Sequence, residues 1–141
     1  MASDAFFGEK DFQQLLVVRR MARDLDIPIT VHGCPTIREI DGLAMSSRNL
    51  LLSDRARVTA PRLFEEMEAL AEGVANGQEF APLQAEAVKR LETAGFTKVE
   101  YLEMRAQDDL SHLEKPDRPA RLFAAAHLAG VRLIDNIAIG D

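Results

Sequence analysis

The sequence predicts an α+β fold: a small antiparallel three-stranded sheet packed by helices, preceded by a helix–strand piece of an α/β repeat. Three observations lead to this prediction. Residues 10–25 space apolar side chains at helical intervals, and residues 26–32 form a short strand pattern. Two longer helical patterns then cover most of residues 61–95. From residue 98 onward the pattern changes to strands, two of which flank Ala129-Gly130 as a hairpin.

The first helix carries three polar residues, Lys10, Asp11 and Gln14, within its apolar arc. The other members of that arc are apolar: Leu15, Val17, Val18, Met21, Ala22 and Leu25. Inward-facing polar groups need hydrogen-bonding partners, because burying them without partners costs on the order of several kcal/mol of free energy. A helix N-terminus preceded by Gly8 also suits phosphate, since unpaired N–H groups and partial positive charge lie there. This corner predicts a ligand site; alternatively, Lys10 reaches solvent while Asp11 and Gln14 cap the first turn.

The strand expected at 26–32 completes one turn of an α/β repeat, whose neighbouring strands should be parallel. No such neighbours are recognised in the sequence, so we expect an orphaned sheet edge that is weakly stable or covered by another copy. Gly33-Cys34-Pro35 then leads into the next unit. Residues 36–40 and 43–45 are expected to form a small hairpin around the Asp41-Gly42 turn.

A second polar cluster, Ser46-Ser47-Arg48, follows this turn. Hydroxyls donate single hydrogen bonds to phosphate oxygens, and arginine offers a bidentate fork. Taken alone, the cluster also fits a surface loop in which a serine caps a turn and Arg48 is solvated. Together, the two clusters offer Lys10, Ser46, Ser47 and Arg48 to one polyanion. Asp11 would then remain available to bind sugar hydroxyls.

The remaining elements have clear boundaries. Ser53 is a good N-cap, Pro61 should break that helix or start the next, and Asn76-Gly77 should end the second. A further helix is expected from Pro82 to Gly95. Strands are expected at 98–104, 121–128 and 131–135, with Asp135-Asn136 structuring a turn at the strand end and His127 packed or at an edge.

Composition sets outer bounds on function. The net charge of −6 argues against nucleic acid as a main partner, because counterion release needs clustered cations. The single Cys34 excludes an internal disulfide and a multi-thiolate zinc site, and it suits a reducing cytoplasm. No apolar run reaches the length of a membrane span, so we expect no membrane partner. We also expect no metal site within this chain.

Four stretches carry a specific resemblance: residues 7–15 (FGEKDFQQL), 35–39 (PTIRE), 41–49 (DGLAMSSRN) and 132–137 (RLIDNI). In this order they resemble the pantothenate synthetase (pantoate–β-alanine ligase) family, and the likeness runs over residues 4–141. Members of that family are about twice as long and begin with a Rossmann-like half carrying a histidine motif, which this sequence lacks. The resemblance therefore implies a C-terminal half; a natural split subunit is the alternative.

The resemblance also implies a domain division. Residues 1–32 would be the tail of the Rossmann-like nucleotide-binding domain, with 1–3 an artificial start, and 33–141 a C-terminal α+β lid domain hinged near Gly33. The intact enzyme would be a cytoplasmic homodimer that condenses pantoate with β-alanine, using ATP and Mg²⁺, through a pantoyl adenylate. AMP and pyrophosphate would be released. This chain alone is expected to be inactive and to hold no cofactor.

Site residues follow from the matching motif positions. Lys10, Ser46, Ser47 and Arg48 would be catalytic, and Gln14 would contact pantoate. The implied ATP-binding set is Gly8, Glu9, Lys10, Asp11, Ile37, Met45, Ser46, Ser47 and Arg48. Two alternatives stay open: a non-catalytic oligomerisation or partner-binding module that kept the fold, and another adenylate-forming nucleotidyltransferase. Co-expression with a polypeptide carrying the histidine motif separates the ligase from the module, because only the ligase predicts restored activity.

Overall fold

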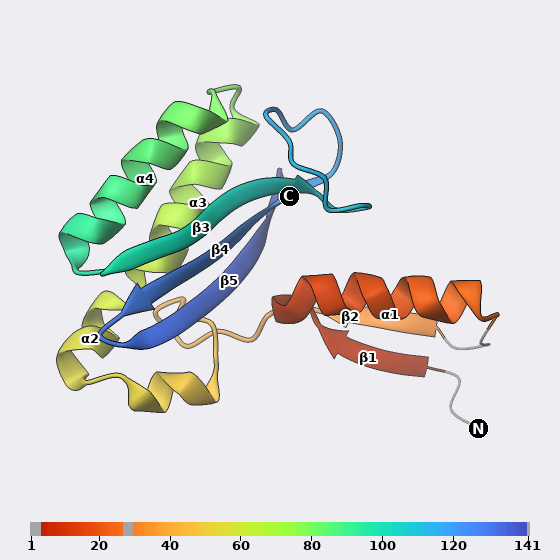
Figure 1. Cartoon of the computed structure of the whole chain (residues 1–141), viewed down its shortest axis with the longest axis horizontal. Helices are drawn as coiled ribbons and strands as arrows, with labels where there is room; N and C mark the ends of the chain where they lie inside the picture. Colours follow the sequence, from red (N-terminus) through yellow and green to blue (C-terminus); the bar gives the residue numbers. More distant parts are fainter. Residues whose placement is uncertain (1–3, 27–29, 141) are drawn as a thin grey trace. The chain divides into compact units, whose positions relative to one another are not determined.

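The computed structural model describes residues 4–26 and 30–140. The chain forms two compact units, Met1–Ile37 and Arg38–Asp141, and each is described by itself below (Figure 1).

The first unit is a strand–helix–strand unit with a parallel two-stranded sheet. Strand β1 (Asp4–Gly8) leads through a short 3₁₀ helix, η1 (Glu9–Asp11), into helix α1 (Phe12–Asp24), and strand β2 (Thr30–Cys34) follows. Strands β1 and β2 pair in parallel from Asp4↔Thr30 to Gly8↔Cys34. The expectation that parallel neighbours were absent is therefore wrong, because β1 supplies one. Strand β2 includes the last part of the predicted strand, and residues 27–29 of that prediction lie outside the described residues.

Helix α1 buries a narrower stripe than its sequence pattern predicts. Phe12 and Leu15 are buried, whereas Val17, Met21 and Leu25 are exposed. A two-stranded sheet covers one stripe of a helix, not a broad face. Gln14 is exposed as well, so the prediction that it faces inward is wrong. The approach of helix to sheet is close, since a Cβ on Gly33 would lie 2.8 Å from Cδ2 of Leu15.

The second unit is the α+β unit that the sequence predicts. It contains a 3₁₀ helix, η2 (Ser47–Leu51), helices α2 (Asp54–Thr59), α3 (Arg62–Ala75) and α4 (Phe80–Ala94), and strands β3 (Lys98–Ala106), β4 (Ala120–Leu128) and β5 (Val131–Ile139). The sheet has the order β3-β4-β5, with antiparallel pairing throughout. Figure 1 shows α3 and α4 side by side along one face of this sheet.

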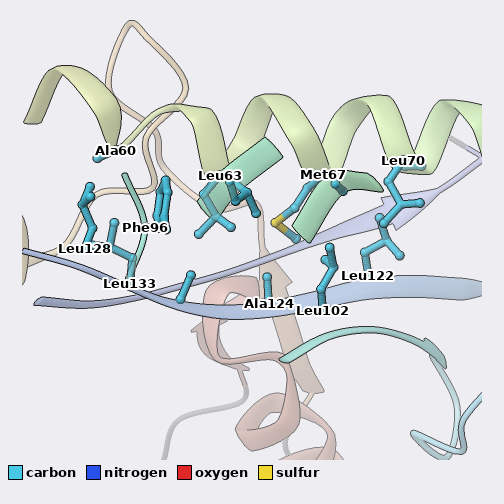
Figure 2. Close-up of a cluster of buried hydrophobic side chains, with 14 of the residues drawn as sticks. Ala60, Leu63, Met67, Leu70, Phe96, Leu102, Leu122, Ala124, Leu128 and Leu133 are labelled. Atoms are coloured by element: carbon cyan, nitrogen blue, oxygen red, sulfur yellow. The ribbon is translucent and has the colours of Figure 1, made fainter. Parts of the chain in front are cut away.

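The core of the second unit lies between α3, α4 and that face of the sheet. Residues at helical spacing on α3 meet residues at every second position of the strands, so two periodicities combine into one apolar layer. Figure 2 shows Met67 directed from α3 toward the strands. Fully buried side chains of this core include Met67, Leu91, Leu102, Met104 and Leu122.

The structure confirms the predicted helix boundaries in this unit except the start of α4. The Ser53 hydroxyl accepts a hydrogen bond from Ala56 N at 3.1 Å and caps α2. Pro61 precedes α3, and Asn76 follows its last residue. Helix α4 ends at Gly95, whose φ is +127°. It begins two residues before Pro82, which falls in the first turn, where the missing proline N–H leaves no gap in the helix.

Two predictions in this unit need correction. The expected hairpin before Ser46 is reduced to one isolated bridge, Arg38↔Ala44, around the Asp41-Gly42 turn. Strand β5 continues to Ile139, so Asp135 and Asn136 lie within the strand and are buried instead of forming a turn at its end. The strand continues because both polar side chains find partners: Asp135 pairs with Arg38, and Asn136 accepts from Arg121.

Within the described part of the chain, no helix combines the length and the apolar character that crossing a bilayer requires.

Candidate functional site

The first candidate cluster lies at the junction of β1, η1 and α1. Gly8 ends β1 opposite Cys34 at the end of β2, so both parallel strands finish at the same edge. Glu9 and Lys10 follow in η1 and are half-buried. In open α/β sheets, ligands bind outside the carboxyl ends of the strands. The structure therefore places these residues where a ligand site is expected for this kind of unit.

Gly8 contributes open space at this junction. Its backbone is extended, with φ −69° and ψ 138°, so the conformation itself does not require glycine. A Cβ at this position would meet no described heavy atom within 4 Å. A ligand can thus approach the backbone here without displacing a side chain of the described residues.

The polar residues of this cluster differ in placement. Asp11 is the last residue of η1, ahead of the α-helix proper, and Gln14 follows on α1, where it is exposed. Ile37, which the resemblance assigns to the nucleotide site, is 71% exposed and ends the first unit. The unit therefore presents Gln14 and Ile37 to solvent rather than to its own core.

The second candidate cluster is the turn that leads into η2. Ser46 is the N-cap of η2, and its hydroxyl accepts a hydrogen bond from Arg48 N at 3.2 Å. Ser47 and Arg48 are exposed, and Met45 is 48% exposed. A capping hydroxyl keeps its own proton available for donation, because it uses only a lone pair in the cap. Two hydroxyls and a guanidinium on one exposed turn suit an anion with several oxygens.

A carboxylate in the same loop is paired with a cation. Asp41 Oδ2 lies 2.7 Å from Arg57 Nη1. The hydrogen bond from the Arg57 side chain is the main reason why the pKa of the Asp41 carboxyl is below its ordinary value. The loop thus carries this negative charge with a counterion beside it, which reduces its repulsion of an incoming anion.

Arg38 and Asp135 form an ion pair that was not predicted from the sequence. Arg38 Nη1 donates to Asp135 Oδ2 at 2.6 Å, and Nη2 donates to Oδ1 at 2.9 Å. The Arg38 guanidinium also lies 4.0 Å from the centroid of the Phe64 ring. The signal was present in the strand: Asp135 takes an inward position in the alternation that includes Val131 and Leu133, and a buried carboxylate needs a partner.

The structure therefore brings together the residues of each cluster within its own unit: Gly8, Glu9, Lys10 and Asp11 in the first, and Met45, Ser46, Ser47 and Arg48 in the second. Among the described residues, no group of three or more His, Cys, Asp or Glu side chains converges as metal ligands would.

The chain is thus an α+β protein of two units. The first is a parallel strand–helix–strand unit with a polar junction, and the second carries the turn of Ser46, Ser47 and Arg48, called here the serine–arginine turn. The family model described as Pantoate-beta-alanine ligase matches residues 1–138, and the chain belongs to this family. The resemblance seen in the sequence is confirmed.

Relatives support the same assignment. The chain is 67% identical to the pantothenate synthetase of Roseobacter denitrificans over 96% of this chain and 48% of that protein. It is 59% identical to that of a Ruegeria species over 98% of this chain and 49% of that protein. The chain thus spans about half the length of the curated relatives it matches, in agreement with the predicted C-terminal portion of such a ligase.

Solved structures agree with the fold. A pantothenate synthetase from Thermus thermophilus superposes with a TM-score of 0.87 at 41% identity, covering 96% of this chain and 49% of that one. A pantoate-beta-alanine ligase from Francisella tularensis, described as complexed with Beta-gamma ATP and Beta-alanine, gives 0.67 at 27% identity, covering 96% and 43%. The predicted α+β fold class is confirmed.

Proposed function

We propose that this chain is the C-terminal portion of an ATP-dependent, AMP-forming ligase that condenses pantoate with β-alanine to pantothenate. The observation that carries the proposal is the match of the ligase family model over residues 1–138. The exposed serine–arginine turn and the polar strand-to-helix junction support it, because both suit a nucleotide's phosphates. The related Francisella tularensis ligase, described with Beta-gamma ATP and Beta-alanine, adds support for these substrates.

The reaction has two steps. In the first, the carboxylate of pantoate attacks the α-phosphorus of ATP, and pyrophosphate leaves with the bonding electrons of the broken P–O bond. In the second, the amine of β-alanine attacks the acyl adenylate, an amide forms, and AMP leaves with a proton released to solvent. Catalysis of the first step rests on positioning and on stabilising the charge of the departing pyrophosphate.

The residues divide between these tasks. Lys10 would act on the phosphates as a point charge, and Ser46, Ser47 and Arg48 would bind the triphosphate. Gly8, Glu9 and Asp11 would line the nucleotide site, with Asp11 at the ribose, while Ile37 and Met45 would contact the adenine. Gln14 would contact pantoate, and its exposure on α1 leaves its amide available for that role.

Mg²⁺ is part of the proposal for the intact enzyme only. The described residues offer no converging set of three acidic, histidine or cysteine ligands. No described residue is therefore proposed to hold the ion.

The domain division and assembly are also proposed. Residues 1–32 would complete a Rossmann-like nucleotide-binding domain, and 33–141 would form a lid that closes over the adenylate and excludes water. The division into two compact units supports such a lid, although their boundary follows Ile37. The intact enzyme would be a cytoplasmic homodimer. ATP-dependent compaction in small-angle scattering of the intact enzyme tests the lid, and an unchanged profile would exclude it.

The test of function is direct. A complete ligase carrying this chain should form pantothenate from ATP, pantoate and β-alanine, with AMP as coproduct detected by mass spectrometry. The isolated chain should form none, and co-expression with the complementary portion should restore the activity. If the complete protein forms no pantothenate, the proposal fails. The alternative, a non-catalytic partner-binding module, predicts no activity in any of these mixtures.

A further inference from the structure

The buried ion pair between Arg38 and Asp135 joins the start of the serine–arginine loop, residues 38–48, to the central part of strand β5. The Asp135 side chain is 2% exposed and that of Arg38 is 18% exposed. Both carboxylate oxygens are used by the guanidinium, and Oδ1 also accepts from Asn136 N at 2.8 Å. A bidentate pair fixes orientation as well as distance, because two parallel hydrogen bonds allow little rotation.

The same guanidinium holds the turn itself. Arg38 Nη1 donates to the Gly42 carbonyl at 3.1 Å, so one side chain contacts both the strand and the far side of the turn. Phe64 of α3 lies beneath both groups: its ring is 4.0 Å from Arg38 Cζ, and a Cβ on Gly42 would approach it to 2.5 Å. The turn is thus enclosed between Arg38 and a core helix.

Packing and hydrogen bonds also restrain the segment between the Asp41-Gly42 turn and Ser46. Leu43 and Ala44 are buried directly after the turn. The Ala44 carbonyl accepts from Asn49 Nδ2 at 3.0 Å, and Asn49 N donates to the Ser46 carbonyl at 3.0 Å. Helix η2, in which Ser47 and Arg48 lie, runs beside β5, the strand that carries Asp135. The turn of Ser46, Ser47 and Arg48, in which Ser47 and Arg48 are exposed, therefore lies beside a segment that hydrogen bonds and packing hold at both ends.

The geometry points to Arg38 and Asp135 as positioning residues for the ligase reaction: their ion pair orients the loop so that Ser46, Ser47 and Arg48 meet the phosphates of ATP. The inference rests on the proposed function. Neither residue touches the nucleotide; each acts through the loop. An exposed turn has to be ordered before it can bind a polyanion well, and a rigid base lowers the entropy lost on binding.

The experiment uses the complete ligase with three variants. Arg38→Lys keeps the charge but loses the fork, and Asp135→Asn keeps the shape but loses the charge. Arg38→Met with Asp135→Leu replaces the pair by apolar groups, an exchange that buried ion pairs often tolerate in stability. Glu100→Gln is the control. Glu100 on β3 makes a bidentate pair with Arg132 on β5 in the same unit, but this pair is more exposed: the side chain of Glu100 is 35% exposed and that of Arg132 is 39% exposed.

We expect kcat/KM for ATP to fall about 100-fold in Arg38→Lys and Asp135→Asn, because a small misplacement of binding groups has effects of this size. The KM for β-alanine should not change. The double variant should recover unfolding temperature relative to Asp135→Asn but not the ATP kinetics, which separates positioning from folding. Glu100→Gln should keep the ATP kinetics of the unsubstituted enzyme.

Two results would overturn the inference while leaving the proposed function intact. One is a double variant with unimpaired ATP kinetics. The other is a parallel loss for ATP and β-alanine that follows the unfolding temperature, which would make the pair purely structural. If the unsubstituted complete enzyme forms no pantothenate, the proposed function fails, and this inference fails with it.

Discussion

Glu100 on β3 accepts two hydrogen bonds from Arg132 on β5, 3.2 Å from Nε and 3.0 Å from Nη2. His127, on the strand between them, places Nε2 3.0 Å from the same carboxylate. One side chain from each strand thus meets in a row across the sheet. The hydrogen bonds from Arg132 and then His127 lower the pKa of Glu100 from 4.5 to about 2.

This row predicts a specific acid sensitivity. A carboxyl group whose pKa is depressed by folding stabilises the folded state above its unfolded pKa, and that contribution is lost as the pH falls through the folded value. For Glu100 the window runs from pH 4.5 down to about 2. Over this window the unfolding temperature of Glu100→Gln should fall less steeply than that of the unsubstituted chain. Parallel curves would show that the row contributes nothing; the exposure of the group makes the expected difference small.

Gly42 should resist substitution more strongly than Gly77. Both have a positive φ, +96° and +94°, but a Cβ on Gly42 would lie 2.5 Å from Cδ2 of Phe64, whereas a Cβ on Gly77 would meet no described atom within 4 Å. Gly77→Ala should therefore show the conformational cost alone, about 1 kcal/mol. Gly42→Ala should cost at least about 1 kcal/mol more, because the ring has to move. Denaturant unfolding measures both, and equal losses would mean that Phe64 yields freely.

Met67 should be a large contributor to the stability of the second unit. Its side chain is fully buried between α3 and the sheet, as Figure 2 shows. Met67→Ala should lower the free energy of unfolding by about 2–5 kcal/mol through lost contacts and a residual cavity. Val58→Ala is the control, because Val58 is 80% exposed, and it should stay within about 0.5 kcal/mol. A small loss at Met67 would indicate that the core collapses around the deletion.

The sequence predicted the second unit well because its signals are local. Ser53, Pro61 and Gly95 act on the helix ends next to them, and the strand alternation reports directly on one buried face. The first unit was predicted less well. Strand β1 is short, and its role becomes visible only through pairing with β2, which follows a whole helix later. Periodicity in α1 gave the possible apolar face but not the width that a two-stranded sheet covers.

The candidate site shows the same division. The serine–arginine turn could be predicted from its residues and from the resemblance, because the motif that contains it is a short, continuous stretch of the sequence. The pairing of Arg38 with Asp135 could not, since the two residues are 97 positions apart and only the fold brings them together. An aspartate among inward-facing apolar residues of a strand indicates the need for a partner but not its identity.

Lys10 and Arg48 provide the sharpest test of the site as a whole, because they come from different units and share one proposed target. In the complete ligase, Lys10→Ala and Arg48→Ala should each slow adenylate formation by about 100-fold or more, as the loss of a group that stabilises transition-state charge does. Pyrophosphate release in a single turnover measures this step directly.

The design separates charge from geometry. Arg48→Lys keeps the charge of an exposed side chain but loses the bidentate fork, so its rate should lie between those of Arg48→Ala and the unsubstituted enzyme. Lys89→Ala and Arg55→Ala remove exposed cations from α4 and α2 and should leave the rate unchanged. If they slow the reaction as much as the site variants do, the effect is one of net charge, and the two clusters do not act on the nucleotide. If only the site variants are slow, the position of each charge matters, as its proposed contact with the nucleotide requires.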